Sequence, residues 1–323
     1  MKNIFIDFES YFNKDYSLKT LSTLQYLRDP RYKLFGMGYA IDNEPPIWVN
    51  WERTEAALKW LDLPNNRVIC HNTNFDGALI IEKYGIRAKR WGDTLGLARA
   101  LLPFEKHGID FLGQQLGRGG KKPGGKLLQT ESPTREQLDE IGEYCIEDVE
   151  VCRLIWGICS PHQPEAQHRL QHIIARWAID PVLQINLPKM LRGVKNATEK
   201  RDALILASGL PEKLLRSGPQ FNQWIIDSGM VPPSKISLKT EQETYALAKS
   251  DVEFLELQTE HSEFAHVWLG RLAATSNIDI TRAQRMHDLG RTGKFPMPLN
   301  YWGAHTGRKS GADKLNVQNL PNA

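Results

Sequence analysis

The sequence predicts an α/β domain over residues 1–160, followed by a mainly α-helical region. Short runs of β-branched and aromatic residues, typical of strands, are concentrated in the first 70 residues. Segments with helical periodicity lie between and after these runs, the arrangement expected of an α/β domain. Beyond Ser160–Pro164, read as a linker, strand signals fade and nearly every periodic segment is helical.

In the α/β domain, each element follows from a local pattern. A turn cluster at residues 42–46 joins two strand-like runs, Ser132-Pro133-Thr134 is a helix start signal, and Thr54 is the expected cap of a short helix. Residues 118–126 are rich in glycine and lysine and are expected to form a flexible basic loop. We expect strands at Ile4–Ile6, Leu34–Ile41, Ile47–Trp51 and Arg67–Cys70, and helices at Thr54–Leu61, Phe75–Tyr84, Thr94–Leu102, Gly108–Leu116 and Thr134–Ile158.

The second region, residues 165–289, is expected to be helical, and residues 290–323 are expected to form turns and extended chain because they are rich in Gly, Asn and Pro. The periodic segments are Glu165–Ala178, Leu187–Ser208, Pro219–Ser228, Glu241–Ala248 and Val252–Arg271.

Composition narrows the class of protein. Hydrophobic residues make up 41% of the 323 residues and charged residues 24%, as in a soluble globular protein. No run of about 18 apolar residues is present, so no membrane span is expected. An acidic residue at position 7 breaks any signal-peptide core, and four cysteines without a CxxC pair fit buried thiols in a reducing compartment, so a cytoplasmic location is expected. The net charge of +3 fits a nucleic-acid partner and a plain solvated surface equally well.

Asp7 and Glu9 are two residues apart on the first expected strand, so their side chains lie on one face. Two carboxylates held this close repel each other unless a cation lies between them. Hard oxygen ligands select Mg²⁺ or Mn²⁺. For this pair alone, a solvated acidic strand face is an open alternative.

Two further acids extend the set. Asp76 is expected in the first turn of a helix that follows a strand, and Asp148 lies four residues after Tyr144, hence on the same helix face. Four carboxylates from separate elements could converge on two metal ions about 4 Å apart, an arrangement in which the metals activate a water and stabilise the leaving oxygen. Tyr144 would then orient the attacking water.

These residues resemble the motifs of the DEDD exonuclease superfamily, tyrosine subtype. The motifs stand here as Asp7-Phe8-Glu9, Asn72-Thr73-Asn74-Phe75-Asp76 and Tyr144-Cys145-Ile146-Glu147-Asp148; the histidine subtype would need His where Glu143 stands. The resemblance covers residues 1–160 and implies a ribonuclease-H-like fold, two Mg²⁺ or Mn²⁺ ions held by the four carboxylates, and hydrolysis of single-stranded 3′ ends. Asn72 would contact DNA, and Phe8 and Phe75 could stack on bases, although a core position is the commoner use of such side chains.

The C-terminal residues carry a second resemblance. Thr306-Gly307-Arg308 and Asn316-Val317-Gln318-Asn319-Leu320-Pro321 are similar to a segment of family A DNA polymerases, especially phage ones, with Val317 in place of the usual Leu. The resemblance implies that Arg308 and Gln318 contact the primer–template, that residues 165–289 form a thumb-like region, and that residues 290–323 begin the palm.

The family's palm acids and fingers lie beyond the matched segment and are absent from this chain. The polypeptide alone is therefore expected not to polymerise DNA. It would be either a shortened polymerase or one half of a split polymerase whose partner chain carries palm and fingers.

Two other functions stay open at this point. An RNase-D-like 3′→5′ exoribonuclease uses the same tyrosine-subtype site, although residues 306–308 and 316–321 argue against it. A DNA-clamping module could keep the fold without catalysis, but all four acids and Tyr144 are present.

Overall fold

The computed structural model describes residues 1–118, 123–237, 241–276, 278–291, 293–313 and 315–319. Within these residues the chain forms two compact units. Unit 1 comprises Met1–Gln184 and Lys294–Ala323, and unit 2 comprises Ile185–Gly293.

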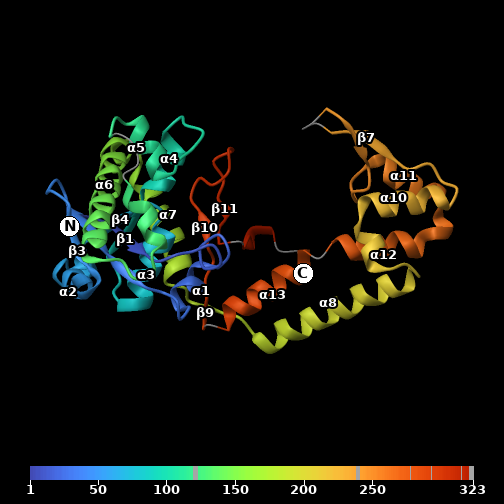
Figure 1. The fold of residues 1–323 in the computed structure, drawn as a ribbon, viewed down its shortest axis with the longest axis horizontal. Helices are drawn as coiled ribbons and strands as arrows, with labels where there is room; N and C mark the ends of the chain where they lie inside the picture. The colour runs from blue at the N-terminus through green and yellow to red at the C-terminus, as the bar shows by residue number, and fades with distance from the viewer. Residues whose placement is uncertain (119–122, 238–240, 277, 292, 314, 320–323) are drawn as a thin grey trace. The chain divides into compact units, whose positions relative to one another are not determined.

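A five-stranded mixed sheet forms the centre of unit 1, in the order β3-β2-β1-β4-β5 (Figure 1). Strands β1, β2 and β3 pair antiparallel, whereas β4 pairs parallel with both β1 and β5. Parallel neighbours require crossover connections, and helices α2 and α3 provide them. The strands are β1 (Asn3–Ser10), β2 (Leu34–Ile41), β3 (Ile47–Asn50), β4 (Arg67–Cys70) and β5 (Arg90–Asp93).

Helices cover both faces of this sheet. Alternate residues of β1 belong to two different cores: Ile4, Ile6 and Phe8 to one, and Phe5, with residues of α4, α5 and α6, to the other. Because side chains alternate along a strand, Asp7 and Glu9 lie on the Phe5 side, the side that α6 covers. The helices are α1 (Thr23–Arg28), α2 (Trp51–Trp60), α3 (Thr73–Tyr84), α4 (Thr94–Leu101), α5 (Ile109–Gln115), α6 (Arg135–Cys159) and α7 (Glu165–Ile179).

The expected elements of the first 160 residues are largely confirmed. The strands Leu34–Ile41 and Arg67–Cys70 have the predicted bounds, and the long helix runs unbroken from Arg135 to Cys159. The expected cap at Thr54 is wrong: helix α2 begins at Trp51, and the Asn50 side chain accepts a hydrogen bond from the Arg53 N–H. Helix α1 and strand β5 were not expected. In the predicted loop 118–126, residues 119–122 lie outside the described part, and 3₁₀ turns span Pro123–Gln129.

Helix α7 packs within unit 1. It contacts α3 and β5, and its apolar side is buried there through Ile174, Ala175, Ala178 and Ile179. The packing boundary therefore falls at residue 184, because the amphipathic α7 completes the first core, rather than at the linker expected at residues 160–164. The functional regions 1–160, 165–289 and 290–323 stay predictions.

Unit 2 is mainly helical around an aromatic core in which Phe221, Phe254 and Trp268 contact one another. The helix expected at Glu241–Ala248 is wrong: Glu243–Tyr245 is a strand, β8, that pairs antiparallel with β7 (Ser234–Ile236), so pairing overrides the local helical pattern. The expected helix Val252–Arg271 is two helices, because the chain turns at His261, whose carbonyl accepts from Trp268 Nε1. The helices are α8 (Leu187–Ala207), α9 (Glu212–Arg216), α10 (Gly218–Asp227), α11 (Val252–Glu260), α12 (Ala265–Thr275) and α13 (Ile278–Gly290). Helices α9 and α13 were not expected.

The C-terminal residues of unit 1 form turns and very short strands, as expected. Strand β9 (Lys294–Phe295) pairs with β6 (Leu183–Gln184), and β10 (Leu299–Asn300) pairs with β11 (Ser310–Gly311). Tyr301 anchors the segment, because its hydroxyl is hydrogen-bonded to Gln163 and Gln167 near the start of α7. Among the described residues, no helix has both the length and the apolar character needed to cross a membrane.

Candidate active site

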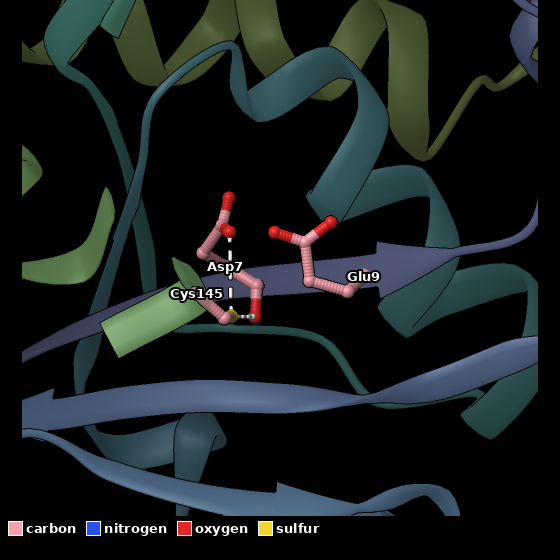
Figure 2. Close-up of side chains that lie close together, drawn as sticks. All are labelled: Asp7, Glu9 and Cys145. Atoms are coloured by element: carbon pink, nitrogen blue, oxygen red, sulfur yellow. Dashed lines mark hydrogen bonds between the residues drawn. The ribbon is translucent and has the colours of Figure 1, made fainter. Parts of the chain in front are cut away.

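Asp7 and Glu9 lie next to each other on β1 (Figure 2). In the β1–β2 ladder their partners are Gly38 and Gly36, so no side chain from β2 separates the acids from the helix above. Glu9 is buried, whereas Asp7 is partly exposed and keeps the pair in contact with solvent. The strand thus presents two adjacent carboxylates in a mostly enclosed position.

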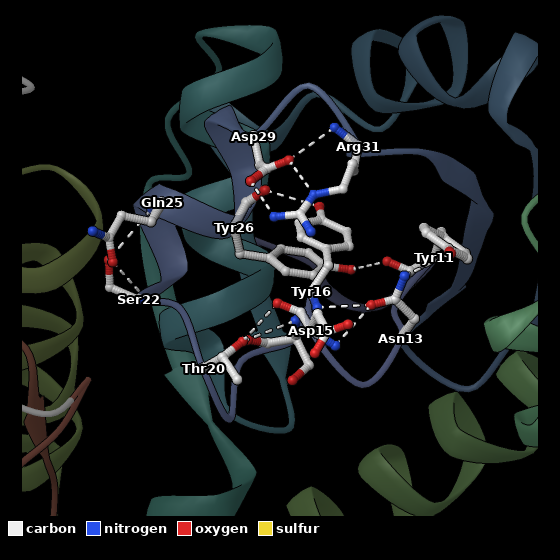
Figure 3. A network of polar contacts seen from close by, with 11 residues as sticks. Tyr11, Asn13, Asp15, Tyr16, Thr20, Ser22, Gln25, Tyr26, Asp29 and Arg31 are labelled. Atoms are coloured by element: carbon white, nitrogen blue, oxygen red, sulfur yellow. Dashed lines mark hydrogen bonds and ion pairs between the residues drawn. The ribbon is translucent and has the colours of Figure 1, made fainter.

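The end of β1 is fixed by a stack of tyrosines from the segment that connects it to β2 (Figure 3). The rings of Tyr16 and Tyr26 stack with centroids 4.5 Å apart. The Tyr26 hydroxyl is hydrogen-bonded to Ser10 Oγ at 2.8 Å and to the Tyr11 carbonyl at 2.5 Å. Because Ser10 directly follows Glu9, this network restrains the strand at the point where it carries the second acid.

Helix α6 brings the third group of residues to β1. It approaches the sheet closely because two glycines leave room: a Cβ on Gly38 would lie 2.8 Å from Cys145 Sγ, and one on Gly142 would lie 2.6 Å from the Trp48 ring. Asp148 is buried on this side of α6, and its charge raises the pKa of Glu9. The predicted Tyr144–Asp148 pair therefore lies beside the predicted Asp7–Glu9 pair.

Asp76 comes from the first turn of α3, whose start is held by Asp93 at the end of β5. The Asp93 carboxylate accepts from the N–H groups of Asn72 at 2.9 Å and Thr73 at 3.3 Å. Asn72 adopts a left-handed conformation with φ 74°, which turns the chain from β4 into the helix. Asp76 is only 3% exposed, and its Oδ1 is buried without a hydrogen-bond partner.

The electrostatics of the group are those of crowded buried acids. Burial raises the pKa of Asp7 and of Glu9, and repulsion from neighbouring carboxylates raises both further. Burial raises the pKa of Asp76 to about 8. Within the described part of the chain, no lysine or arginine forms an ion pair with any of these three acids. Among the described residues, no basic side chain thus supplies the positive charge that would stabilise their ionised forms.

This donor set fits a divalent cation. Carboxylate oxygens are the ligands of Mg²⁺ and Mn²⁺, and a buried carboxylate oxygen without a partner, such as Asp76 Oδ1, costs about 1–3 kcal/mol unless something binds it. Ligand atoms of Asp7, Glu9 and Cys145 all lie within 4.8 Å of one another, close enough for one ion. A cation at this position would offset the repulsion between the carboxylates.

Tyr144 is half-buried beside these acids. Burial, together with the charges of Asp148 and Glu9, raises the pKa of its phenol above the ordinary value. The hydroxyl therefore stays protonated at neutral pH and can donate a hydrogen bond.

The residues predicted to bind DNA lie in varied places. Phe8 is 5% exposed in the core on the side of β1 opposite Asp7, so it is not available for stacking on a base. Phe75 is half-buried and packs edge-to-face on Tyr26, with ring centroids 5.8 Å apart. Asn72 is half-buried at the start of α3, whereas Arg308 and Gln318 are exposed in the C-terminal residues of unit 1. Of the predicted segment 316–321, residues 320 and 321 lie outside the described part.

Sequence reasoning missed two residues of this site. Asp93 precedes the helix beginning at Thr94 and accepts from the Gly96 N–H, so an N-cap signal was present, but its second role at α3 depends on the fold. Cys145 was expected only as a buried thiol. Its Sγ in fact lies 3.4 Å from Asp7 Oδ2 and 3.5 Å from the Asp7 carbonyl oxygen.

Comparison with known proteins finds similarity to one DNA polymerase in sequence and to another in fold. No protein-family model matches it. A DNA polymerase of Bacillus phage SP02 is 24% identical over 357 residues, an alignment that covers 99% of this chain and 51% of the phage protein. The POL domain of Pol1 from M. smegmatis, solved in complex with DNA primer–template and dNTP, superposes with a TM-score of 0.64 at 13% identity, over 99% of this chain and 52% of that one.

The structure of Brucella melitensis NrnC with bound Mg²⁺ matches 55% of this chain and 83% of its own at 12% identity, with a TM-score of 0.41. The chain spans about half the length of the phage polymerase and of the Pol1 structure. Along nearly its whole length it is therefore similar in sequence to a phage DNA polymerase and in fold to a bacterial one.

Proposed function

We propose that the chain is the 3′→5′ proofreading exonuclease portion of a family A DNA polymerase, which hydrolyses the 3′-terminal phosphodiester of DNA. The observation that carries the proposal is the convergence of Asp7 and Glu9 from β1, Asp76 from α3 and Asp148 from α6 as four acids in one mostly buried site. The similarity to a phage DNA polymerase over 99% of the chain supports it.

The strand order supports a ribonuclease-H-like fold for this part of the chain. Three antiparallel strands are followed by two parallel ones, with β1 in the middle and the first acids on it. The tyrosine-subtype motifs lie on a strand, a helix start and a helix, as that family resemblance requires.

The mechanism assigns a role to each side chain. Asp7, Glu9, Asp76 and Asp148 would hold two Mg²⁺ or Mn²⁺ ions, which when bound supply a nucleophilic water at neutral pH and stabilise charge on the leaving oxygen. Asp76, whose pKa is about 8, must give up its proton when it becomes a ligand. Tyr144 donates its phenolic proton in a hydrogen bond that orients the attacking water, a role that its raised pKa favours.

The substrate is proposed to be a single-stranded 3′ end delivered from a primer–template. The mycobacterial structure was solved with primer–template DNA, and the described part of the C-terminal segment offers exposed Arg308 and Gln318 for phosphate and groove contacts. Residues 165–289 are proposed as a thumb-like region and residues 290–323 as the start of a palm.

A comparison of DNA and RNA substrates tests this function. Purified chain is incubated with Mg²⁺ and 5′-labelled single strands of DNA and RNA of one sequence, and shortening from the 3′ end is followed on a gel. The proposal expects faster shortening of DNA, loss of that activity in Asp148→Asn, and full activity in Asp139→Asn, a matched change at an exposed position of the same helix.

Two outcomes would point elsewhere. Preferential degradation of RNA would favour an RNase-D-like enzyme. Inert protein with both Mg²⁺ and Mn²⁺ would favour the non-catalytic clamping module.

A further inference from the structure

The thiol of Cys145 belongs to the group of acids on β1. In Figure 2 the Cys145 side chain comes from α6 and points at Asp7, and its Sγ lies 3.4 Å from Asp7 Oδ2. One ligand atom from each of Asp7, Glu9 and Cys145 lies within 4.8 Å of the other two. Cys145 itself is fully buried.

The spacing of these atoms suits direct bonds to one ion. With metal–sulfur and metal–oxygen bonds of about 2.3 and 2.1 Å, a sulfur–oxygen separation of 3.4 Å corresponds to an angle of roughly 100° at the metal. That angle is close to tetrahedral. A second, independent observation concerns a neighbouring acid: Asp76 Oδ1 is buried with no hydrogen-bond partner, and the charge of Asp76 raises the pKa of Asp7.

We propose that Cys145, Asp7 and Glu9 form a site for a thiophilic divalent cation such as Zn²⁺ or Cd²⁺. Binding of that cation takes two of the proposed catalytic ligands and arrests the nuclease; this consequence rests on the proposed function, whereas the binding itself stands on the geometry.

Ligand softness gives the site its selectivity. Mg²⁺ prefers six oxygen ligands in octahedral geometry and gains nothing from sulfur. Zn²⁺ and Cd²⁺ form strong bonds to thiolate and accept tetrahedral mixed sites. The carboxylates of Asp7 and Glu9 serve either kind of ion, but the sulfur of Cys145 serves only the soft one. A cation bound through sulfur is drawn toward α6 and away from the octahedral position that two-metal hydrolysis needs.

The other cysteines supply controls. Cys159 lies at the end of the same helix, is buried, and has no carboxylate among the groups that act on its thiol. Cys152 is hydrogen-bonded to Thr94 and belongs to the core. Cys159→Ala therefore removes a thiol from α6 without touching the acids, and Cys145→Ala removes the one beside them.

The test is a Cd²⁺ titration of the full chain, followed by the ultraviolet charge-transfer band of the cadmium–thiolate bond. Wild type is expected to develop a band that saturates at one ion per chain, Cys159→Ala to keep it, and Cys145→Ala to lose it. A Cys145→Ser variant, which preserves volume, is expected to lose the band as well. No band in wild type, or an undiminished band in Cys145→Ala, would overturn the site.

A second arm measures Mg²⁺-supported trimming of single-stranded DNA with added Cd²⁺, each variant normalised to its own rate without Cd²⁺. Loss of the sulfur is expected to raise the Cd²⁺ concentration for half-inhibition by roughly 10–100-fold, the scale on which losing one supporting group weakens metal sites. Equal inhibition of wild type and Cys145→Ala would contradict the proposal that a cation bound at Cys145 arrests the nuclease. If wild type trims no DNA, the proposed function fails in this arm, and the absorption band still shows whether Cys145 binds the cation.

Discussion

Asn72 donates its backbone N–H to Oδ1 of Asp93 across a distance of 2.9 Å, and this bond sets where helix α3 begins. The same carboxylate accepts from Thr73 and from Gly96, so one side chain caps α3 and α4 together. Asp76 lies in the first turn of α3, and its position over β1 therefore depends on Asp93.

Asp93→Ala is expected to lower the free energy of unfolding by about 1–3 kcal/mol, because it leaves buried N–H groups of two helices without an acceptor. It is also expected to weaken Mn²⁺ binding, measured by calorimetry, because Asp76 loses its fixed position. Asp93→Asn keeps an acceptor oxygen and should therefore retain part of the stability and part of the Mn²⁺ affinity. Unchanged Mn²⁺ affinity in Asp93→Ala would show that Asp93 does not position Asp76; Glu105→Ala, at an exposed position, is the control.

Metal-free protein is expected to lose stability as the pH rises from 4 to 8. The pKa of Asp76 is raised from its ordinary 3.8 to about 8, so in this window the folded state holds a proton that the unfolded state has released. Stability is then greatest below the unfolded pKa and falls toward the folded one, with a slope of at most about 1.4 kcal/mol per pH unit from this group.

Thermal unfolding in EDTA across this range checks that expectation. The difference between wild type and Asp76→Asn isolates the contribution of Asp76, since the amide has no proton to lose. A difference that stays constant with pH would mean that Asp76 is not protonated in the folded, metal-free protein.

Mn²⁺ affinity is expected to rise with pH up to about 8, because each ion must displace protons that burial retains on Asp76 and its neighbours. While Asp76 alone titrates, the change is at most about tenfold per pH unit. Calorimetric titrations at several pH values, in buffers of different ionisation enthalpy, give both the affinity and the number of protons released. Binding without proton release would argue against metal ligation by these acids.

Gly38→Ala is expected to destabilise the protein by about 1–3 kcal/mol and to slow any metal-dependent hydrolysis, because the new methyl group would lie 2.8 Å from Cys145 Sγ and push α6 off β1. Gly157→Ala is the control: Gly157 lies in α6, is exposed, and has open space in the direction of an added Cβ. Alanine at position 157 should stabilise the protein by roughly 0.5–1 kcal/mol, because alanine has a higher helix propensity than glycine. Urea unfolding of both variants decides whether the contact at residue 38 limits the approach of α6.

Local sequence patterns were sufficient to predict most strands of the sheet and the shared face of Asp7 and Glu9. Leu34–Ile41 is recognisable because a turn cluster follows an apolar run, and Asp7 and Glu9 share a face because any strand alternates its side chains. Strand β5, with the sequence Arg-Trp-Gly-Asp, contains no β-branched residue; pairing with β4 makes it a strand.

The missed parts of the site depend on contacts between distant residues. Asn72 and Asp93 are 21 positions apart, and Asp7 and Cys145 are 138 apart, so no window of sequence contains either pair. The close approach of α6 further requires Gly38 on another strand. These relationships belong to the packing of elements, which periodicity alone does not specify.

The most direct test of the proposed function is cleavage of a 3′-mispaired primer–template with Mg²⁺ by wild type and by Asp7→Ala/Glu9→Ala. The account predicts that wild type removes the mispaired nucleotide and that the double variant, which lacks two metal ligands, shows almost no rate because it has lost several kcal/mol of transition-state stabilisation. A double variant that trims as fast as wild type would contradict the assignment of the site to β1, and a wild type that leaves the mispaired end intact with both Mg²⁺ and Mn²⁺ would contradict the proofreading function itself.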